Sequence, residues 1–170
     1  MIKKLIVMAA LAACLIIPFT AGAAEVGIGY NIQTEAVNSL NDIDEASIMQ
    51  GLSVRAWFDK IGVEGNFMWP EDNSLMAYSV KTMYAPFVTE KFKGYIGGTI
   101  MDIEANDGFL TNDDENALAY GSFIGAEYKV FDDLGINFDV IYYFQNDKDN
   151  GVVDVEMEEV SFAFGVHYYF

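Results

Sequence analysis

Cysteine, histidine, proline and basic residues are all scarce in this chain of 170 residues. The single cysteine, Cys14, lies in an N-terminal segment that we expect to be removed, so the mature chain has no disulfide. Nine lysines and arginines stand against 26 aspartates and glutamates. This imbalance excludes nucleic acid as a partner, because an acidic surface repels phosphate. Only three prolines occur and no useful stretch has helical periodicity, which leaves β-strands as the structural unit.

Long apolar runs are missing as well, apart from one near the N-terminus. Leu5–Phe19 is apolar, follows two lysines and precedes the small residues Ala21-Gly22-Ala23, which is the order of parts in a signal peptide. The run is shorter than the roughly 20 residues that a membrane-spanning helix needs. The sequence therefore predicts a signal peptide over residues 1–23 and a single mature domain over residues 24–170.

A second signal overlaps the first. Leu11-Ala12-Ala13-Cys14 resembles a lipobox, in which Cys14 would be lipidated. The apolar run continues well past Cys14, however, and the small residues follow at its end. Cleavage without lipidation is the favoured interpretation, and lipidation remains the alternative.

The C-terminal segment alternates strictly between two kinds of residue. Small or polar residues separate large apolar ones, and a strand sends alternate side chains to opposite faces. The outward set is Phe162, Phe164, Val166, Tyr168 and Phe170. This pattern predicts the closing strand of a transmembrane barrel, with lipid outside and a packed lumen inside. It also resembles the C-terminal insertion signal of bacterial outer-membrane barrels, which implies the barrel assembly machinery as a partner.

The same alternation recurs along the mature chain and predicts an all-β fold, an eight-stranded antiparallel up-and-down transmembrane β-barrel. The predicted strands are Val26–Ile32, Ser47–Phe58, Ile61–Trp69, Leu75–Ala85, Phe92–Met101, Ala117–Val130, Ile136–Phe144 and Val160–Phe170. Phe92, Ile96 and Ile100 are expected to face outward on the fifth, glycine-rich strand, which has the weakest pattern. Polar residues share a face with Gly, Ala and Ser, while Val, Ile, Phe and Tyr fill the other. A soluble lipid-binding barrel would have the opposite arrangement.

The connections differ in length and charge. Those after the second, fourth and sixth strands are short, at Asp59-Lys60, 87–91 and 132–135. The other four are mostly longer, and 18 of the 26 acidic residues lie in or beside them. Outer-membrane barrels have short periplasmic turns and longer external loops, so we expect both termini on the periplasmic side.

Two further segments support a family resemblance. Gly125-Ala126-Glu127-Tyr128-Lys129 before a tight turn and Gly135-Ile136-Asn137-Phe138-Asp139 after it are typical of a penultimate hairpin, and Gly165–Phe170 of a closing strand. The chain resembles the small eight-stranded outer-membrane barrels of the OmpA/OmpX type. The resemblance implies a monomer in the outer membrane of a Gram-negative bacterium. It covers the whole mature chain, but its motifs are architectural. We expect no peptidoglycan-binding domain after Phe170, and hence not the wall-anchoring role of the longer relatives.

Charged side chains are predicted inside the barrel. They are Arg55, Glu64, Lys81, Glu127, Lys129 and Asp139, with Lys93 on the fifth strand. A two-residue turn at Asp59-Lys60 would place Arg55 opposite Glu64, and Lys129 is expected opposite or diagonal to Asp139. Because so narrow a lumen is filled by side chains, these charges must pair or be hydrated. Ion pairs that plug the lumen and ion pairs that open as a gate would need the same residues.

The sequence offers few candidates for a catalytic or metal-binding site. His167 is the only histidine, and Ser161 lies about 20 Å from it along the strand, too far to be its nucleophile. The sequence therefore predicts no enzymatic activity, no cofactor and no metal site. Asp147–Gly151 lacks a ligand that a calcium loop requires. The acidic cluster Asp113-Asp114-Glu115 is a solvated surface or shares divalent cations with lipopolysaccharide.

The predicted function is that of an outer-membrane barrel with a structural or surface-interaction role through acidic external loops. The expected partners are outer-membrane lipid and lipopolysaccharide, the latter through divalent cations. A narrow pore or carrier for ions or small solutes, porin-like in function, is the alternative. A soluble lipid-binding barrel and a lipid-modifying enzyme are further alternatives.

Overall fold

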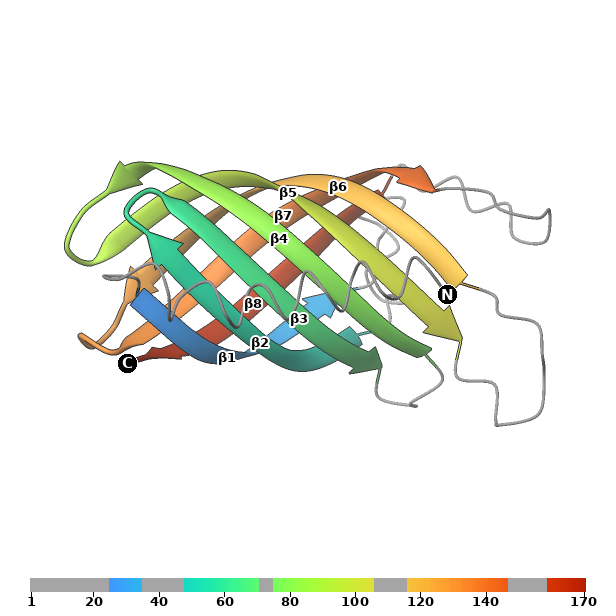
Figure 1. The fold of residues 1–170 in the computed structure, drawn as a ribbon, viewed down its shortest axis with the longest axis horizontal. Helices are drawn as coiled ribbons and strands as arrows, with labels where there is room; N and C mark the ends of the chain where they lie inside the picture. The colour runs from blue at the N-terminus through green and yellow to red at the C-terminus, as the bar shows by residue number, and fades with distance from the viewer. Residues whose placement is uncertain (1–24, 35–47, 71–74, 106–115, 147–158) are drawn as a thin grey trace.

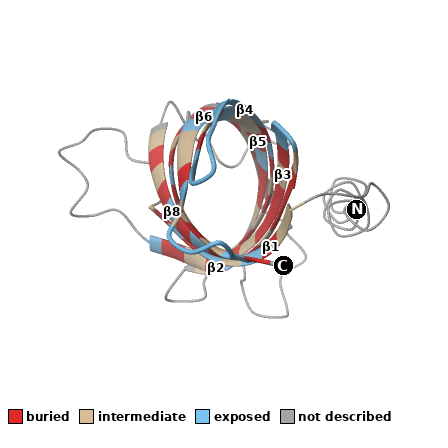
Figure 2. Cartoon of the chain, turned by 90° about the vertical axis from the view of Figure 1, so that its left-hand side faces the viewer, coloured by how far each residue is buried: buried red, intermediate tan, exposed pale blue. Residues whose placement is uncertain are grey.

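The computed structural model describes residues 25–34, 48–70, 75–105, 116–146 and 159–170. Its strands are β1 (Glu25–Thr34), β2 (Ile48–Phe58), β3 (Ile61–Pro70), β4 (Leu75–Val88), β5 (Phe92–Ala105), β6 (Asn116–Lys129), β7 (Leu134–Asn146) and β8 (Glu159–Tyr169). Each strand pairs with the next in an antiparallel ladder, and β1 pairs with β8 to close the barrel (Figures 1 and 2). None of the described segments is a helix of the length and hydropathy that crossing a bilayer would take.

The predicted all-β, eight-stranded antiparallel fold is confirmed, and every predicted strand is present. Strand ends differ in places. The fourth strand was expected to end at Ala85, but β4 continues to Val88 through a register shift between Tyr84 and Phe87. Pro86 lies in this irregularity and has no N–H to donate, which makes a bulge the natural place for it. Pairing with β5 resumes at Phe87, opposite Gly94.

The turn before β7 also differs from the prediction. It was expected at residues 132–135, yet the strand begins at Leu134. The backbone N–H groups of Val130 and Phe131 both donate to the carbonyl of Leu134, which closes the turn two residues earlier. Lys129 therefore lies opposite Gly135. The turn at Asp59-Lys60 is as predicted, and Asp59 adopts the left-handed conformation (φ 56°) that tight hairpins need.

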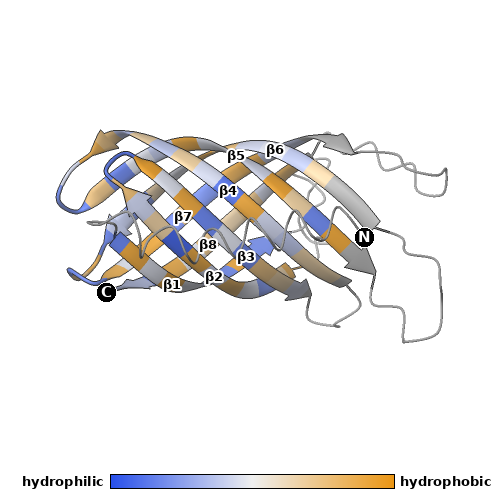
Figure 3. Cartoon of the chain, viewed as in Figure 1, coloured by the Kyte–Doolittle hydropathy of each residue, from blue (hydrophilic) through white to orange (hydrophobic). Residues whose placement is uncertain are grey.

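Burial follows the predicted alternation, fifth strand included. Phe92, Ile96 and Ile100 are exposed on the outside, while Lys93 and Tyr95 are buried inside. Apolar and polar positions alternate along the strands, as the banding in Figure 3 shows. Large exposed apolar side chains occur on all eight strands. The barrel thus has an apolar exterior and a partly polar interior, the reverse of a soluble protein.

The interior has three zones along the barrel axis. The two ends of the barrel are named here by their connections. The turn end carries the three short turns and the C-terminus, at the left of Figure 1, and the opposite end is the loop end. Toward the loop end the lumen is mainly apolar, and toward the turn end it is aromatic, with charges between. Buried side chains of the loop half include Met49, Met68, Ala77, Met101, Ala119 and Ala163, and those nearest the turn end include Trp57, Met83 and Tyr169.

Candidate functional site in the barrel lumen

Arg55 is the centre of the buried charges. The short β2–β3 hairpin places it directly opposite Glu64, as predicted, and its guanidinium forms an ion pair with that carboxylate. Its Nη1 atom also lies 2.6 Å from Oε2 of Glu127, on β6. All three side chains are at most 1% exposed. One guanidinium therefore links two carboxylates from different walls of the barrel.

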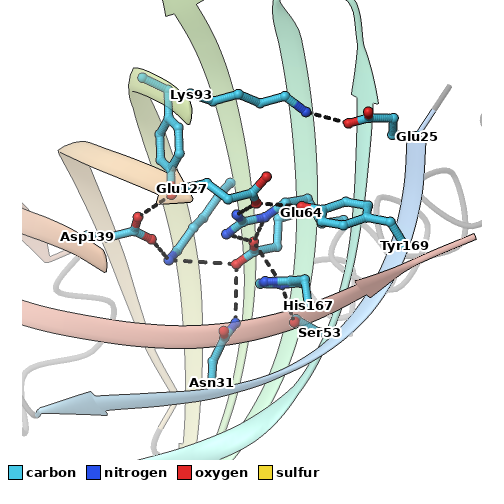
Figure 4. A network of polar contacts seen from close by, with 12 residues as sticks. Glu25, Asn31, Ser53, Glu64, Lys93, Glu127, Asp139, His167 and Tyr169 are labelled. Atoms are coloured by element: carbon cyan, nitrogen blue, oxygen red, sulfur yellow. Dashed lines mark hydrogen bonds and ion pairs between the residues drawn. The ribbon is translucent and has the colours of Figure 1, made fainter. Parts of the chain in front are cut away.

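Lys81 on β4 extends this group of charges. Its Nζ atom is 2.7 Å from Oδ2 of Asp139 on β7 and 3.7 Å from Oε1 of Glu64. The other carboxylate oxygen of Asp139 accepts a hydrogen bond of 2.7 Å from the hydroxyl of Tyr95. Arg55, Lys81, Glu64, Glu127 and Asp139 are called the central network below (Figure 4).

Amide and hydroxyl side chains border the central network toward the loop end. The Nδ2 group of Asn31 donates to Oδ1 of Asn66 at 2.6 Å, and Nδ2 of Asn66 donates to the Ser79 hydroxyl at 3.1 Å. The Nδ2 group of Asn31 also donates to Oε1 of Glu64 at 3.4 Å. All four side chains are buried. Such hydrogen bonds offset part of the cost of burying charge.

A second group of charges, the rim cluster, closes the turn end. Glu25 on β1 accepts from Lys93 at 2.5 Å and from Lys129 at 2.6 Å. Lys93 lies 4.8 Å from the ring centroid of Trp57, and Lys129 lies 5.5 Å from that of Tyr169. The rim cluster joins β1 to β5 and β6, which do not neighbour it in the sheet. The shared carboxylate of Glu25 and cation–π contacts with the rings of Trp57 and Tyr169 therefore hold the two ammonium groups in place.

The predicted contact between Lys129 and Asp139 is wrong. Because β7 begins earlier than expected, Asp139 lies opposite Gly125, and Lys129 is four residues further along β6. Lys129 pairs instead with Glu25, and Asp139 pairs with Lys81. The structure thus divides the predicted charges between the central network and the rim cluster, and it adds Glu25 to the rim.

His167 forms a contact that sequence reasoning missed. Its Nε2 atom lies 2.9 Å from the hydroxyl oxygen of Ser53, although β8 and β2 are separated by β1. Gly29 pairs with both residues in the register, and a Cβ atom there would come within 2.7 Å of the Ser53 hydroxyl. The glycine therefore lets the two side chains meet across a strand. The alternation pattern had already placed both in the lumen, but only closure of the barrel shows that they touch.

The serine–histidine pair has few features of a nucleophilic site. Both residues are nearly inaccessible, at 3% exposure for Ser53 and 0% for His167. Nδ1 of the histidine, where a catalytic triad has its carboxylate, has no hydrogen-bond partner in the described part of the chain. Glu64 approaches the other ring nitrogen, Nε2, at 3.6 Å. The ring nitrogen Nε2 thus lies at the Ser53 hydroxyl, while no described group orients the ring through Nδ1. The absence of enzymatic activity stays a prediction.

The remaining predictions concern metal binding, the N-terminal segment, the acidic clusters and the insertion signal. Among the described residues, no group of three or more acidic, histidine or cysteine side chains is arranged to hold a metal ion. The predicted signal peptide, which contains Cys14, and the acidic clusters at 113–115 and 147–151 lie outside the described residues. The apolar side chains of the predicted insertion signal, from Phe162 to Phe170, face outward on β8. Their recognition by assembly machinery stays a prediction.

No protein-family model matches the chain, and no curated protein matches it. Solved structures do match its fold. A de novo designed transmembrane β-barrel has a TM-score of 0.56 at 10% identity, with 86% of this chain and 95% of that chain covered. The crystal structure of Neisserial surface protein A has a TM-score of 0.55 at 14% identity, with 86% and 97% covered. The outer-membrane protein Ail of Yersinia pestis, in a phospholipid bilayer nanodisc, has a TM-score of 0.50 at 18% identity, with 87% and 100% covered.

At these identities the likeness shows the fold alone. The chain has the fold of small transmembrane β-barrels, both natural and designed. The match covers nearly the whole length of each of these barrels, so the strand order and closure are shared from end to end. Residue roles do not transfer at this distance, and the lumen must be interpreted from its own contacts.

Proposed function

We propose that the chain is an outer-membrane barrel of a Gram-negative bacterium, of the OmpA/OmpX type, with a structural or surface-interaction role. The observation that carries the proposal is the apolar exterior. Ile28, Leu52, Ile61 and Ile124 are each more than half exposed on different strands. Removing one such side chain from water is worth roughly 1.5–3 kcal/mol, so a belt of them requires a lipid environment.

The similar structures support this location and role. Ail is an outer-membrane protein whose fold is known in a phospholipid bilayer, and its name denotes attachment and invasion. The Neisserial barrel is named a surface protein. A surface role for this chain rests on the acidic connections at the loop end, which we expect to face outward. Lipopolysaccharide, bridged by divalent cations, is the proposed contact there, and the barrel is proposed to act as a monomer.

The side chains in the lumen favour a closed barrel rather than a pore. The central network occupies the middle with charges that are at most 4% exposed, and the loop half contains mostly apolar side chains, with Gln33 and Ser161 buried among them. One observation favours the alternative, a narrow pore. Lys81 lies within 4 Å of two carboxylates, Asp139 and Glu64, so it has a second partner available if the first is lost. Exchange between them is the kind of step that a gate would use.

Conductance decides between these two functions. Refolded protein spanning residues 24–170 is placed in planar bilayers, after heat-dependent gel mobility has shown that it is folded. The Glu64→Gln variant is measured in parallel, with Glu90→Gln as the control, because Glu90 is exposed in the β4–β5 turn. We expect no channels from any of the three proteins. Discrete openings that change in Glu64→Gln but not in Glu90→Gln would instead establish the pore.

A further inference from the structure

The ladder that closes the barrel, between β1 and β8, joins two strands that are not consecutive in the chain. A tight turn fixes the register of a hairpin, but no turn connects these two strands. A slip of this ladder by one residue is excluded, because it would turn the apolar side chains of a strand from the outside into the lumen. A slip by two residues keeps the alternation and changes only the stagger of the barrel. Side chains in the lumen must therefore select among registers that differ by two residues.

Three consecutive inward-facing pairs of this ladder each combine a large side chain with a glycine. They are Tyr169 with Gly27, His167 with Gly29 and Asn31 with Gly165. The fit is close. A Cβ atom on Gly27 would lie 2.8 Å from the ring of Tyr169, and one on Gly29 would lie 2.6 Å from Nε2 of His167. Each glycine thus leaves the space that the side chain opposite it occupies.

His167 extends beyond its glycine to the next strand. It starts from β8, passes over Gly29 on β1, and places Nε2 2.9 Å from the hydroxyl of Ser53 on β2 (Figure 4). Gly29 pairs with both of these residues in the register. The contact therefore ties β8 to β2 across β1, and it depends on glycine at the position between them.

Asn31 makes the reverse crossing. It starts from β1 and lies over Gly165 on β8, and Gly165 also pairs with Asn137 on β7. Oδ1 of Asn31 and Oδ1 of Asn137 both lie where a Cβ atom of Gly165 would be. The two amides are therefore neighbours across the glycine, as His167 and Ser53 are across Gly29.

The other end of the Asn31 amide fixes its orientation. Its Nδ2 group donates to Oδ1 of Asn66 at 2.6 Å and to Oε1 of Glu64 at 3.4 Å, so its oxygen faces Asn137. That oxygen accepts no hydrogen bond from the described part of the chain, and neither does Oδ1 of Asn137. The two ends of an amide are nearly equal in size, so a half-turn of Asn137 exchanges its oxygen and nitrogen without repacking. It gives Oδ1 of Asn31 the donor that it lacks.

We propose that Asn31 and His167 form a reciprocal clasp that selects the register in which the barrel closes. Asn31 crosses Gly165 and accepts a hydrogen bond from Nδ2 of Asn137, and His167 crosses Gly29 to the hydroxyl of Ser53. The clasp ties the closing strands to β2 and β7, the strands on either side of them. It is a property of closure and does not depend on the proposed surface role.

A slip by two residues breaks the clasp in either direction. One direction places Gly29 opposite Gly165, so that two glycines meet and leave a void. The other direction places Asn31 opposite His167, so that two large side chains compete for the space of one. The second slip is the more informative one, because truncating either side chain removes the collision.

Disulfide cross-linking measures the register. Cys14 is the only cysteine in the sequence, so protein spanning residues 24–170 contains none. Ile32→Cys with Phe164→Cys reports the native register, because these outward-facing residues are directly opposite. Ile32→Cys with Val166→Cys reports the slip that places Asn31 opposite His167. In the native register that second pair is offset by about 7 Å along the strands, too far for a disulfide.

Each pair is refolded in detergent with a glutathione buffer, and mass spectrometry gives the yield of cross-link. The native pair should cross-link about tenfold more than the offset pair, or better, given the usual cost of overpacking. Asn31→Ala and His167→Ala should each raise the yield of the offset pair several-fold. Asn66→Ala is the control, since it also deletes a buried lumen amide that bonds to Asn31 but lies on β3, away from the closing ladder. If neither variant exceeds this control, the clasp does not select the register and the proposal is wrong.

A double-mutant cycle tests the hydrogen bond between the two amides. Asn31→Ala and Asn137→Ala each remove it, so the double variant should lose little more stability in urea than the more damaged single variant. Asn137→Ala combined with Thr99→Val is the control pair, because Thr99 is buried in the lumen on β5, away from the clasp, and the two losses should add. Additive losses for Asn31 and Asn137 as well would show that the amides do not bind each other, which removes that half of the clasp.

Discussion

Nη1 of Arg55 lies 2.6 Å from Oε2 of Glu127, although the two residues are 72 positions apart in the chain. Their strands, β2 and β6, share no ladder. The ion pair therefore crosses the lumen and exists only when the barrel is closed. Glu64 binds the same guanidinium from the adjacent strand. Arg55 therefore takes part both in a contact within its own hairpin and in a contact that requires the closed barrel.

Replacing Glu64 should destabilise the barrel strongly. Glu64→Gln removes the carboxylate that Arg55 and Lys81 share in the lumen, and breaking a buried pair typically costs about 3–5 kcal/mol. Urea unfolding of detergent-refolded protein measures the loss. The exposed Glu90→Gln change should stay within about 0.5 kcal/mol of the parent chain. Equal effects of the two changes would show that the central network contributes no stability.

Enlarging Gly29 should separate His167 from Ser53. A Cβ atom in Gly29→Ala would lie 2.6 Å from Nε2 of the histidine and 2.7 Å from the serine hydroxyl, so the pair must move. Overpacking of this kind costs about 1–3 kcal/mol. Gly94→Ala is the control, since its nearest neighbour would lie 3.4 Å away, an ordinary contact. The same urea titration compares them, and an unfolding midpoint unchanged in both would contradict the close approach.

The serine hydroxyl should be unreactive. Ser53 is 3% exposed, and Nδ1 of His167 has no hydrogen-bond partner among the described residues. A fluorophosphonate probe applied to folded protein should therefore give no labelled peptide containing Ser53, by mass spectrometry. A serine hydrolase treated alongside verifies the probe. Labelling that disappears in Ser53→Ala would reverse this conclusion and make the pair a candidate for catalysis.

A charge on the outer face should distinguish lipid from water. Ile124 is 62% exposed near the middle of β6, and Phe131 is 66% exposed in the turn that follows. In a bilayer, Ile124→Arg should cost about 2–4 kcal/mol, whereas Phe131→Arg near the interface should cost about 0–1 kcal/mol. Unfolding from phospholipid vesicles gives both values. A water-soluble barrel would tolerate both changes equally.

The terminal phenylalanine should matter for assembly more than for stability. Phe170 is 70% exposed, so Phe170→Ala removes few internal contacts. Spontaneous refolding in detergent should remain unchanged, while insertion into vesicles that contain barrel assembly machinery should slow. Phe131→Ala, at 66% exposure, is the matched control and should insert at the parental rate. Equal rates for all three chains would remove the predicted insertion signal.

Much of the fold follows from the sequence because a strand's side chains alternate with a period of two. That rule identifies all eight strands and the inward or outward facing of Lys93 and Phe92 on the fifth. The pair Arg55–Glu64 is equally local, since a two-residue turn fixes the register of its hairpin. Where the turn is misplaced the argument fails, as it does for Lys129 and Asp139.

Contacts across the lumen were decided by the tertiary structure alone. The alternation places Ser53 and His167 in the interior but does not say that they meet. Glu25 precedes the predicted first strand, so its contact with Lys93 comes from the structure. Those contacts depend on where β1 closes against β8 and on how far the strands are staggered around the ring. Alternation is a property of each strand by itself, whereas stagger is set by all eight ladders together. The sequence therefore predicts which side chains line the lumen, and only the closed barrel shows which of them contact one another.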